Sequence, residues 1–270
     1  MTRHNAQEQT EPGAGPGQIT FAVILVALGI LGIVKHEFTP LWNPVSANLP
    51  ARSVLIYGCA LISLTSGIGL LWSRTAVFAA RVLFAGQLLW FLLLRVRDVI
   101  LSPTFGVFWP AFVTAVLLAA AWALYHRFAT DSEKRRLAFF AGDNGLRIAR
   151  ALYGASTIFF GLAHFIDPQD TLVLEPHWLP WHVFWAYFFG CTFIAAGIAI
   201  LIGTLARLAV TLSGVQLALF TALVWIPIVA AGSKNAFQWS ETILSVTLTA
   251  AAWVVAESYR GLPWLAVNRH

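Results

Sequence analysis

Long apolar runs separated by short polar segments dominate the chain from residue 18 onward. A membrane-spanning helix needs about 17 to 25 mostly apolar residues, and eight runs are of that order. They lie at residues 18–34, 53–73, 75–94, 103–126, 148–166, 183–205, 208–231 and 238–257. The pattern therefore predicts an all-α, polytopic membrane protein with eight transmembrane helices.

Three polar segments flank or divide these runs. Residues 1–17, rich in Gly, Pro and Gln, are expected to form a disordered tail, residues 127–147 a basic linker, and residues 258–270 a second tail. The first run has neither a basic approach nor a small-residue cleavage site of the signal-peptide kind, so we expect it to be a retained helix.

Composition excludes the other protein classes. Hydrophobic residues make up 59% of the chain, charged residues 11%, and the mean hydropathy is +0.74. Soluble domains carry about a quarter charged residues, and a disordered chain or a disulfide-rich scaffold needs a different composition. The net charge of +5 does not indicate nucleic-acid binding, because the basic residues lie in short loops between apolar runs.

The distribution of basic residues predicts the orientation. With eight spans both termini lie on one side, and 12 of the 17 Lys and Arg residues fall on that side. The positive-inside rule then places both termini in the cytoplasm of a multi-pass protein of the cell (inner) membrane.

The two halves of the chain, residues 18–126 and 148–257, resemble one another at an offset of about 130 positions. Tyr57 then aligns with Tyr187 and Gly67 with Gly197, and slips of one or two residues align His36 with His164 and Gln87 with Gln216. Each half contains an even number of spans, so the prediction is two parallel four-helix bundles related by an axis along the membrane normal.

Small residues recur every four positions in the second helix of each half. They are Cys59, Ser63 and Gly67, then Cys191, Ala195, Ala199 and Gly203. Small residues at this spacing allow close helix packing in a membrane, so we expect both stripes to be buried at helix contacts.

A run of motifs in the second half is similar to the DoxX-like family of small four-helix membrane proteins. The motifs are Gly161-Leu-Ala-His164-Phe165, Glu175-Pro-His-Trp-Leu-Pro180-Trp-His182 and Gly197-Ile-Ala-Ile-Leu-Ile-Gly203, followed by Arg207. The resemblance covers residues 147–231, and it reaches the first half only through the likeness of the halves. It implies a membrane-embedded helical bundle. The family is named after the small membrane subunit of a thiosulfate:quinone oxidoreductase. A eukaryotic cargo receptor is among the related proteins, and most members have no established activity.

Polar residues concentrate at the predicted outer face. They are His36, Glu37, His164, Asp167, Glu175, His177 and His182. Imidazole and carboxylate groups there could pass protons to or from a quinone, or they could simply mark where the helices leave the bilayer. No H-x-x-x-H or C-x-x-C spacing accompanies them, so neither a metal site nor any cofactor beyond a possible quinone is predicted.

Two glutamines, Gln87 and Gln216, fall near the middle of the third and seventh spans. Buried amides commonly bond across helix contacts in membranes. The alternative is a pair of amides that face a ligand inside the membrane.

Three functions follow from these patterns. The first is a non-catalytic module that binds an apolar ligand or a partner protein, with a homo-oligomer among the possible assemblies. The second is a membrane subunit of a quinone-linked oxidoreductase, and the third is a small-solute or lipid transporter. Motifs for phosphate-binding loops, serine esterases and zincins are absent from the sequence, so catalysis by this chain alone is not expected.

Overall fold

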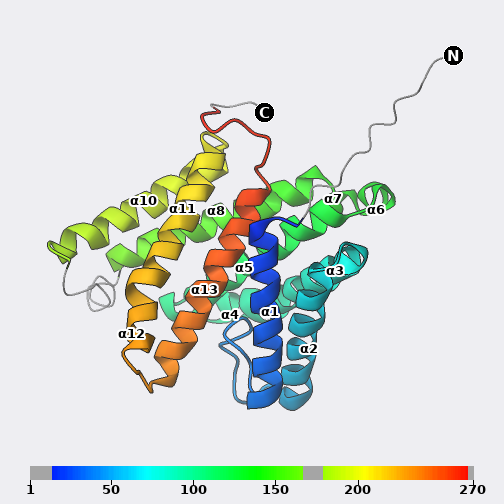
Figure 1. Cartoon of the computed structure of the whole chain (residues 1–270), viewed down its shortest axis with the longest axis horizontal. Coiled ribbons are helices and arrows are strands. Elements are labelled where there is room, and N and C mark those ends of the chain that lie inside the picture. The colour runs from blue at the N-terminus through cyan, green and yellow to red at the C-terminus, as the bar shows by residue number, and fades with distance from the viewer. Residues whose placement is uncertain (1–13, 167–178, 267–270) are drawn as a thin grey trace.

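The computed structural model describes residues 14–166 and 179–266, and this part of the chain is helical without any strand (Figure 1). Seven helical runs in it are long and apolar enough to cross a membrane. They are α1 (Pro16–Lys35), α2 (Arg52–Leu70), the run Ser73–Leu101, α5 (Phe105–Phe128), α10 (His182–Ile202), the run Ala206–Ala230 and α13 (Ala236–Glu257). Such a set of helices fits an α-helical membrane protein in a lipid bilayer.

The fifth predicted span, residues 148–166, corresponds to α8 (Asp143–Ile166), which has 24 residues but is not among these seven runs. Its first two turns carry Asp143, Arg147 and Arg150, which reduce its hydropathy. Two short helices precede it where a linker was expected, α6 (Asp131–Arg136) and α7 (Ala138–Ala141).

The third and seventh predicted spans are composite. The third consists of α3 (Ser73–Trp90), the π-helical segment η1 (Phe91–Val96) and α4 (Arg97–Leu101). The seventh consists of α11 (Ala206–Phe220), the π-helical segment η2 (Thr221–Trp225) and α12 (Ile226–Ala230). The predicted end of the third span at residue 94 is wrong, because the helix continues through η1 to Leu101.

Glycine contacts hold α1 against α2 and α8 against α10. A Cβ atom on Gly67 would lie 2.7 Å from the carbonyl oxygen of Ala22, and one on Gly197 would lie 2.5 Å from that of Gly154. Only glycine allows such close backbone approach, which is how helices associate tightly in a membrane.

The prediction for the small-residue stripes is correct in the first half and wrong in the second. Cys59 and Ser63 are buried on α2, whereas Cys191 and Ala195 are exposed on α10. The buried face of α10 runs through Gly190, Phe193 and Gly197 instead. One residue corresponds to a rotation of about 100° on a helix, so a small error of register exchanged a buried face for an exposed one.

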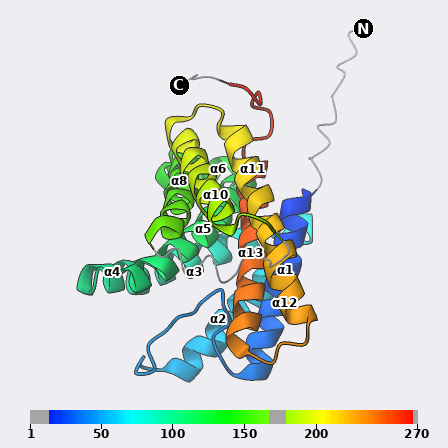
Figure 2. The same cartoon turned by 90° about the vertical axis from the view of Figure 1, so that its left-hand side faces the viewer.

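The helices form two groups that meet at α5 and α13. The helix α3 packs between α2 and α5, and α11 packs between α10 and α13. The first helix of each group packs against the last helix of the other, which pairs α1 with α13 and α8 with α5. The two views show α13 and α5 in the middle of the assembly (Figures 1 and 2). Of the seven runs, α5 is the most buried, because 72% of the residues in its apolar stretch are buried inside the protein.

Carboxylates join helices at the end of the protein that carries both termini. The backbone N–H of Gly17 donates a 2.8 Å hydrogen bond to Glu257 at the end of α13, and Arg127 lies 3.5 Å from the same carboxylate. Glu133 of α6 accepts a 2.7 Å hydrogen bond from Nη2 of Arg81 of α3, and the ion pair brings Nε of Arg81 within 2.6 Å of Oε1. Arg81 is therefore paired within the protein.

Candidate functional site

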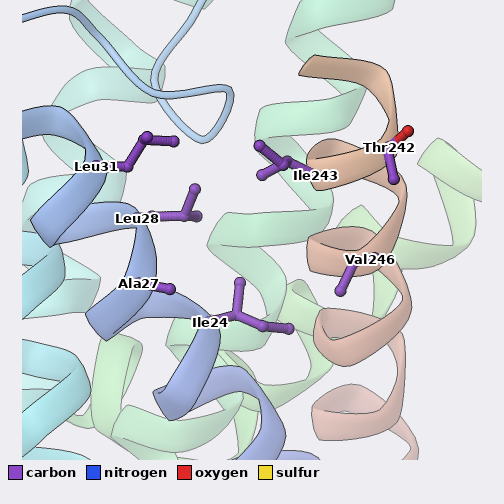
Figure 3. Close-up of a pocket in the computed structure, with 7 residues that line it drawn as sticks. All are labelled: Ile24, Ala27, Leu28, Leu31, Thr242, Ile243 and Val246. Carbon is purple, nitrogen blue, oxygen red and sulfur yellow. The ribbon is translucent and has the colours of Figure 1, made fainter. Parts of the chain in front are cut away.

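A groove of about 350 Å³ opens between α1 and α13 (Figure 3). Its walls are Ile24, Ala27, Leu28, Leu31, Thr242, Ile243 and Val246. Figure 3 shows the α1 side chains projecting toward Ile243 and Val246 of α13. The volume lies within the range of about 300 to 1,000 Å³ that is usual for small-molecule sites.

The groove exists because the two helices approach closely at one end and separate toward the other. A Cβ atom on Gly17 would lie 2.8 Å from the backbone carbon of Trp253, which marks the contact. From there α1 and α13 diverge toward the lower edge of Figure 1. Ile24, Leu28 and Leu31 follow helical spacing and share one face of α1. Ala27, on the rim, is too small to close the gap.

The chemistry of the groove is almost wholly aliphatic. The single polar side chain in its wall is Thr242, whose hydroxyl donates a 2.7 Å hydrogen bond to the carbonyl oxygen of Gln238. The walls therefore direct no free donor at a guest, and they suit a hydrocarbon rather than a polar molecule.

A second site of interest is Arg95, a charged residue of η1 that is only 2% exposed. Its guanidinium donates to the carbonyl oxygens of Trp42, Asn43 and Pro44 at 2.6–2.9 Å, and its Nε donates to Thr114 at 3.1 Å. A buried guanidinium needs such partners, because its desolvation is otherwise costly. Arg95 thus fastens the loop after α1 to η1 and α5.

The same loop is buried by aromatic packing. Trp42 is 1% exposed, donates to Ser63 at 3.0 Å and lies edge-on to Trp90 with ring centroids 5.2 Å apart. Trp42 is therefore part of the protein core. Beside this loop is an opening of about 430 Å³ that Arg95 and Asp98 help to line.

The first pair of predicted outer-face residues lies at the end of α1. His36 caps the helix in a left-handed conformation, with φ 55°, and its Nδ1 lies 2.6 Å from the hydroxyl of Tyr57 on α2. Glu37 follows and is exposed.

The second group lies at the end of α8 and the start of α10. His164 is in the last turn of α8, its Nδ1 is buried without a hydrogen-bond partner among the described residues, and its ring centroid lies 6.2 Å from that of Phe193. His182 is the first residue of α10. The predictions for Asp167, Glu175 and His177 fall outside the described residues.

These two groups occupy separate places. Both views show the lower end of α1 apart from the end of α8 and the start of α10 (Figures 1 and 2). In the described part of the chain no group of three or more His, Cys, Asp or Glu residues could hold a metal ion. His36 and Glu37 therefore do not join His164 and His182 in one site.

The two glutamines differ in their surroundings. Gln216 accepts from Thr192 at 2.8 Å and donates to the carbonyl oxygen of Phe189 at 3.0 Å, so it connects α11 to α10. Gln87 is 1% exposed, and neither of its amide atoms has a hydrogen-bond partner in the described structure. The buried residues of α3 and α11 correspond at an offset of 130 positions. At that offset the position equivalent to Gln87 is Leu217, not Gln216.

Reasoning from the sequence missed the groove and Arg95. The groove depends on how far two helices distant in sequence diverge, which no local pattern encodes. Arg95 did leave a signal, since it follows the apolar residues 91–94 directly, but its partners are backbone carbonyls in a loop more than 40 positions away. No protein-family model, curated protein or solved structure matches the chain.

Proposed function

We propose that this protein is a non-catalytic membrane module, similar to the DoxX-like family, that binds an apolar ligand. The observation that carries the proposal is the aliphatic groove between α1 and α13. Catalytic sites converge several polar or titratable groups on one cavity, whereas this groove contains one hydroxyl that is already bonded to its own helix.

The proposal includes eight membrane spans in two similar four-helix units, with both termini in the cytoplasm. Two features support α8 as a further span, which brings the total to eight. It has 24 residues, and it packs along α10 as α1 packs along α2. Its charged residues gather in the first two turns, where they can reach the headgroup region. The pairing of α1 with α13 and of α8 with α5 is what two related units would produce.

Mass spectrometry of the intact protein released from native membranes tests the function. We expect an apolar molecule to remain bound, and an excess of competing detergent to release it without unfolding the protein. A partner protein retained in the same spectrum, in place of an apolar ligand, would contradict ligand binding and favour the alternative of a protein-interaction module.

A second candidate, a subunit that exchanges protons with quinone, is favoured by one observation. The Nδ1 of His164 is buried and has no hydrogen-bond partner among the described residues, so a quinone oxygen that reached it would supply the missing partner. If quinone is the ligand, the His164→Ala variant should retain less of it, whereas His36→Ala should not, because His36 already bonds to Tyr57.

A further inference from the structure

The seam between α5 and α8 is the counterpart of the groove between α1 and α13. The run Ala-Ala-Ala-Trp occurs at residues 119–122 of α5 and again at residues 250–253 of α13, 131 positions later. The same offset relates Thr114, which accepts from Arg95 of η1, to Ser245, which bonds to Thr221 of η2 at 2.7 Å. Equivalent positions on α5 and α13 thus differ by 131.

A similar offset relates α1 to α8. Gly197 meets Gly154 of α8 as Gly67 meets Ala22 of α1, and Gly154 lies 132 positions after Ala22. On this register His164 corresponds to Gly32 rather than to His36.

Large aromatic side chains stand where the groove has small or aliphatic ones. By these offsets Ala27 corresponds to Phe159 and Ile243 to Phe112. Phe159 and Phe112 stack on one another with ring centroids 4.3 Å apart and planes at 19°. Rings of the chain itself therefore fill the α5–α8 seam, whereas about 350 Å³ stays open in the α1–α13 seam.

An apolar space at a helix contact forfeits dispersion contacts unless something fills it. The groove is open at its rim, where Ala27 is exposed, and it lies between two helices that are apolar enough to span a bilayer. In a bilayer, such helices are surrounded by the hydrocarbon chains of lipid molecules. A ring that carries carbonyl groups fits less well, because the only wall hydroxyl donates to Gln238.

We propose that one acyl chain of a membrane phospholipid occupies the α1–α13 groove, in the place that Phe112 and Phe159 fill in the other seam. This inference rests on the proposed function and names the class of its ligand. The chain lies along Leu28 and Ile243 and completes the contact between α1 and α13.

Photocrosslinking tests the proposal directly. The full chain is reconstituted in vesicles of phosphatidylethanolamine and phosphatidylglycerol that contain a phospholipid with a diazirine on its acyl chain, and labelled peptides are mapped. We expect labelling to concentrate at residues 24–31 and 242–246. The double variant Ala27→Phe/Ile243→Phe reproduces the rings of the other seam, and it should reduce that labelling about tenfold, equivalent to ~1.4 kcal/mol of binding free energy.

Two matched variants complete the experiment. Ala195→Phe/Ile198→Phe makes the same changes on the exposed face of α10 and should leave labelling of the groove unchanged. Phe112→Ala/Phe159→Ala empties the other seam and should create new labelling on α5 and α8. This gain of a site keeps the test valid even if the filled groove prevents folding.

The outcomes separate this proposal from the proposed function. Even labelling of all lipid-facing helices, or groove labelling that survives Ala27→Phe/Ile243→Phe, would overturn the acyl-chain site. If an apolar ligand is nevertheless retained in the intact-protein spectrum, the proposed function stands. If no apolar ligand is retained either, both fail. Retention of a quinone that the double variant releases would show that the occupant is not an acyl chain.

Discussion

The Nη1 atom of Arg95 lies 2.6 Å from the carbonyl oxygen of Pro44 and so joins the third membrane run to the loop that follows α1. The same guanidinium reaches Trp42, Asn43 and Thr114. The buried charge of Arg95 holds the loop against the third membrane run, because backbone carbonyls of that loop supply most of its hydrogen-bond acceptors.

Replacing Arg95 by Ala should destabilise the protein substantially. The change leaves the carbonyl oxygens of Asn43 and Pro44 without this donor, whereas that of Trp42 still accepts from Trp90, and each buried unsatisfied group costs about 1–3 kcal/mol. We expect the free energy of unfolding to fall by about 3 kcal/mol in total, since partial relaxation of the loop recovers some of the loss. Denaturant titration in detergent micelles measures it.

The control is Arg97→Ala, which removes the same charge from a side chain that is 65% exposed. Equal stability of the two variants would mean that Arg95 does not hold the loop.

The glycine contacts between α1 and α2 predict a position-specific loss of stability. An alanine at Gly67 would place its Cβ 2.7 Å from the Ala22 carbonyl oxygen, so the helices must separate. We expect Gly67→Ala to lower the free energy of unfolding by ~1–3 kcal/mol. Gly58→Ala, on the same helix with nothing within 4 Å of the new Cβ, should be neutral or slightly stabilising. Thermal unfolding of both variants provides the comparison, and a neutral Gly67→Ala would refute the close packing.

Glu133 should make stability depend on pH in the acidic range. Burial by itself raises the pKa of this carboxyl, but hydrogen bonds from Arg81 and Thr130 outweigh burial and hold the pKa below its usual value. A pKa lower in the folded than in the unfolded state stabilises the protein above the unfolded value, about 4.3, and this contribution is lost as the pH falls through the folded value.

Thermal unfolding measured from pH 6 down to about pH 3 tests this effect. The Glu133→Gln variant should lose less stability on acidification than the natural chain does. Asp131→Asn removes a carboxylate from the same short helix and serves as the control. If Glu133→Gln and the natural chain respond identically to acid, the Arg81–Glu133 ion pair does not contribute to stability.

Eight spans require both termini and the segment 127–147 to share one side of the membrane. Reporter fusions at each end and after Arg136, in intact cells, determine the three locations. We expect all three in the cytoplasm, because most Lys and Arg residues lie on that side. Termini on opposite faces would instead mean that α8 does not cross the bilayer.

The sequence predicted the positions of the helices well, since hydropathy depends only on local composition. The predicted ranges 103–126 and 238–257 differ from α5 and α13 by two residues or fewer at each end. The main error was at Arg95, where a charge was taken to end a helix that continues to Leu101. A local pattern cannot show that distant carbonyl groups neutralise the cost of burying that charge.

For the candidate sites, prediction was limited by distance along the chain. Gln216 was interpreted as packing between helices, and its bonds to Thr192 and Phe189 agree. His36 was paired with His164 on the likeness of the sequences, whereas in the structure Gly32 lies against Ala60 as His164 lies against Gly190, 130 positions after Ala60. Periodic apolar segments align almost equally well one turn apart, and only backbone contacts distinguish the alternatives.

The sequence by itself determined the surrounding medium and the places of the apolar helices, because the free energy of placing residues in hydrocarbon sums over each segment separately. Tertiary structure alone decided which helix faces meet and which seam stays open. Ala27 and Phe159 are both ordinary residues of apolar runs. The seam at Ala27 stays open and the seam at Phe159 is filled because of the helices that pack there, α13 against α1 and α5 against α8, and because of how far each pair of helices diverges.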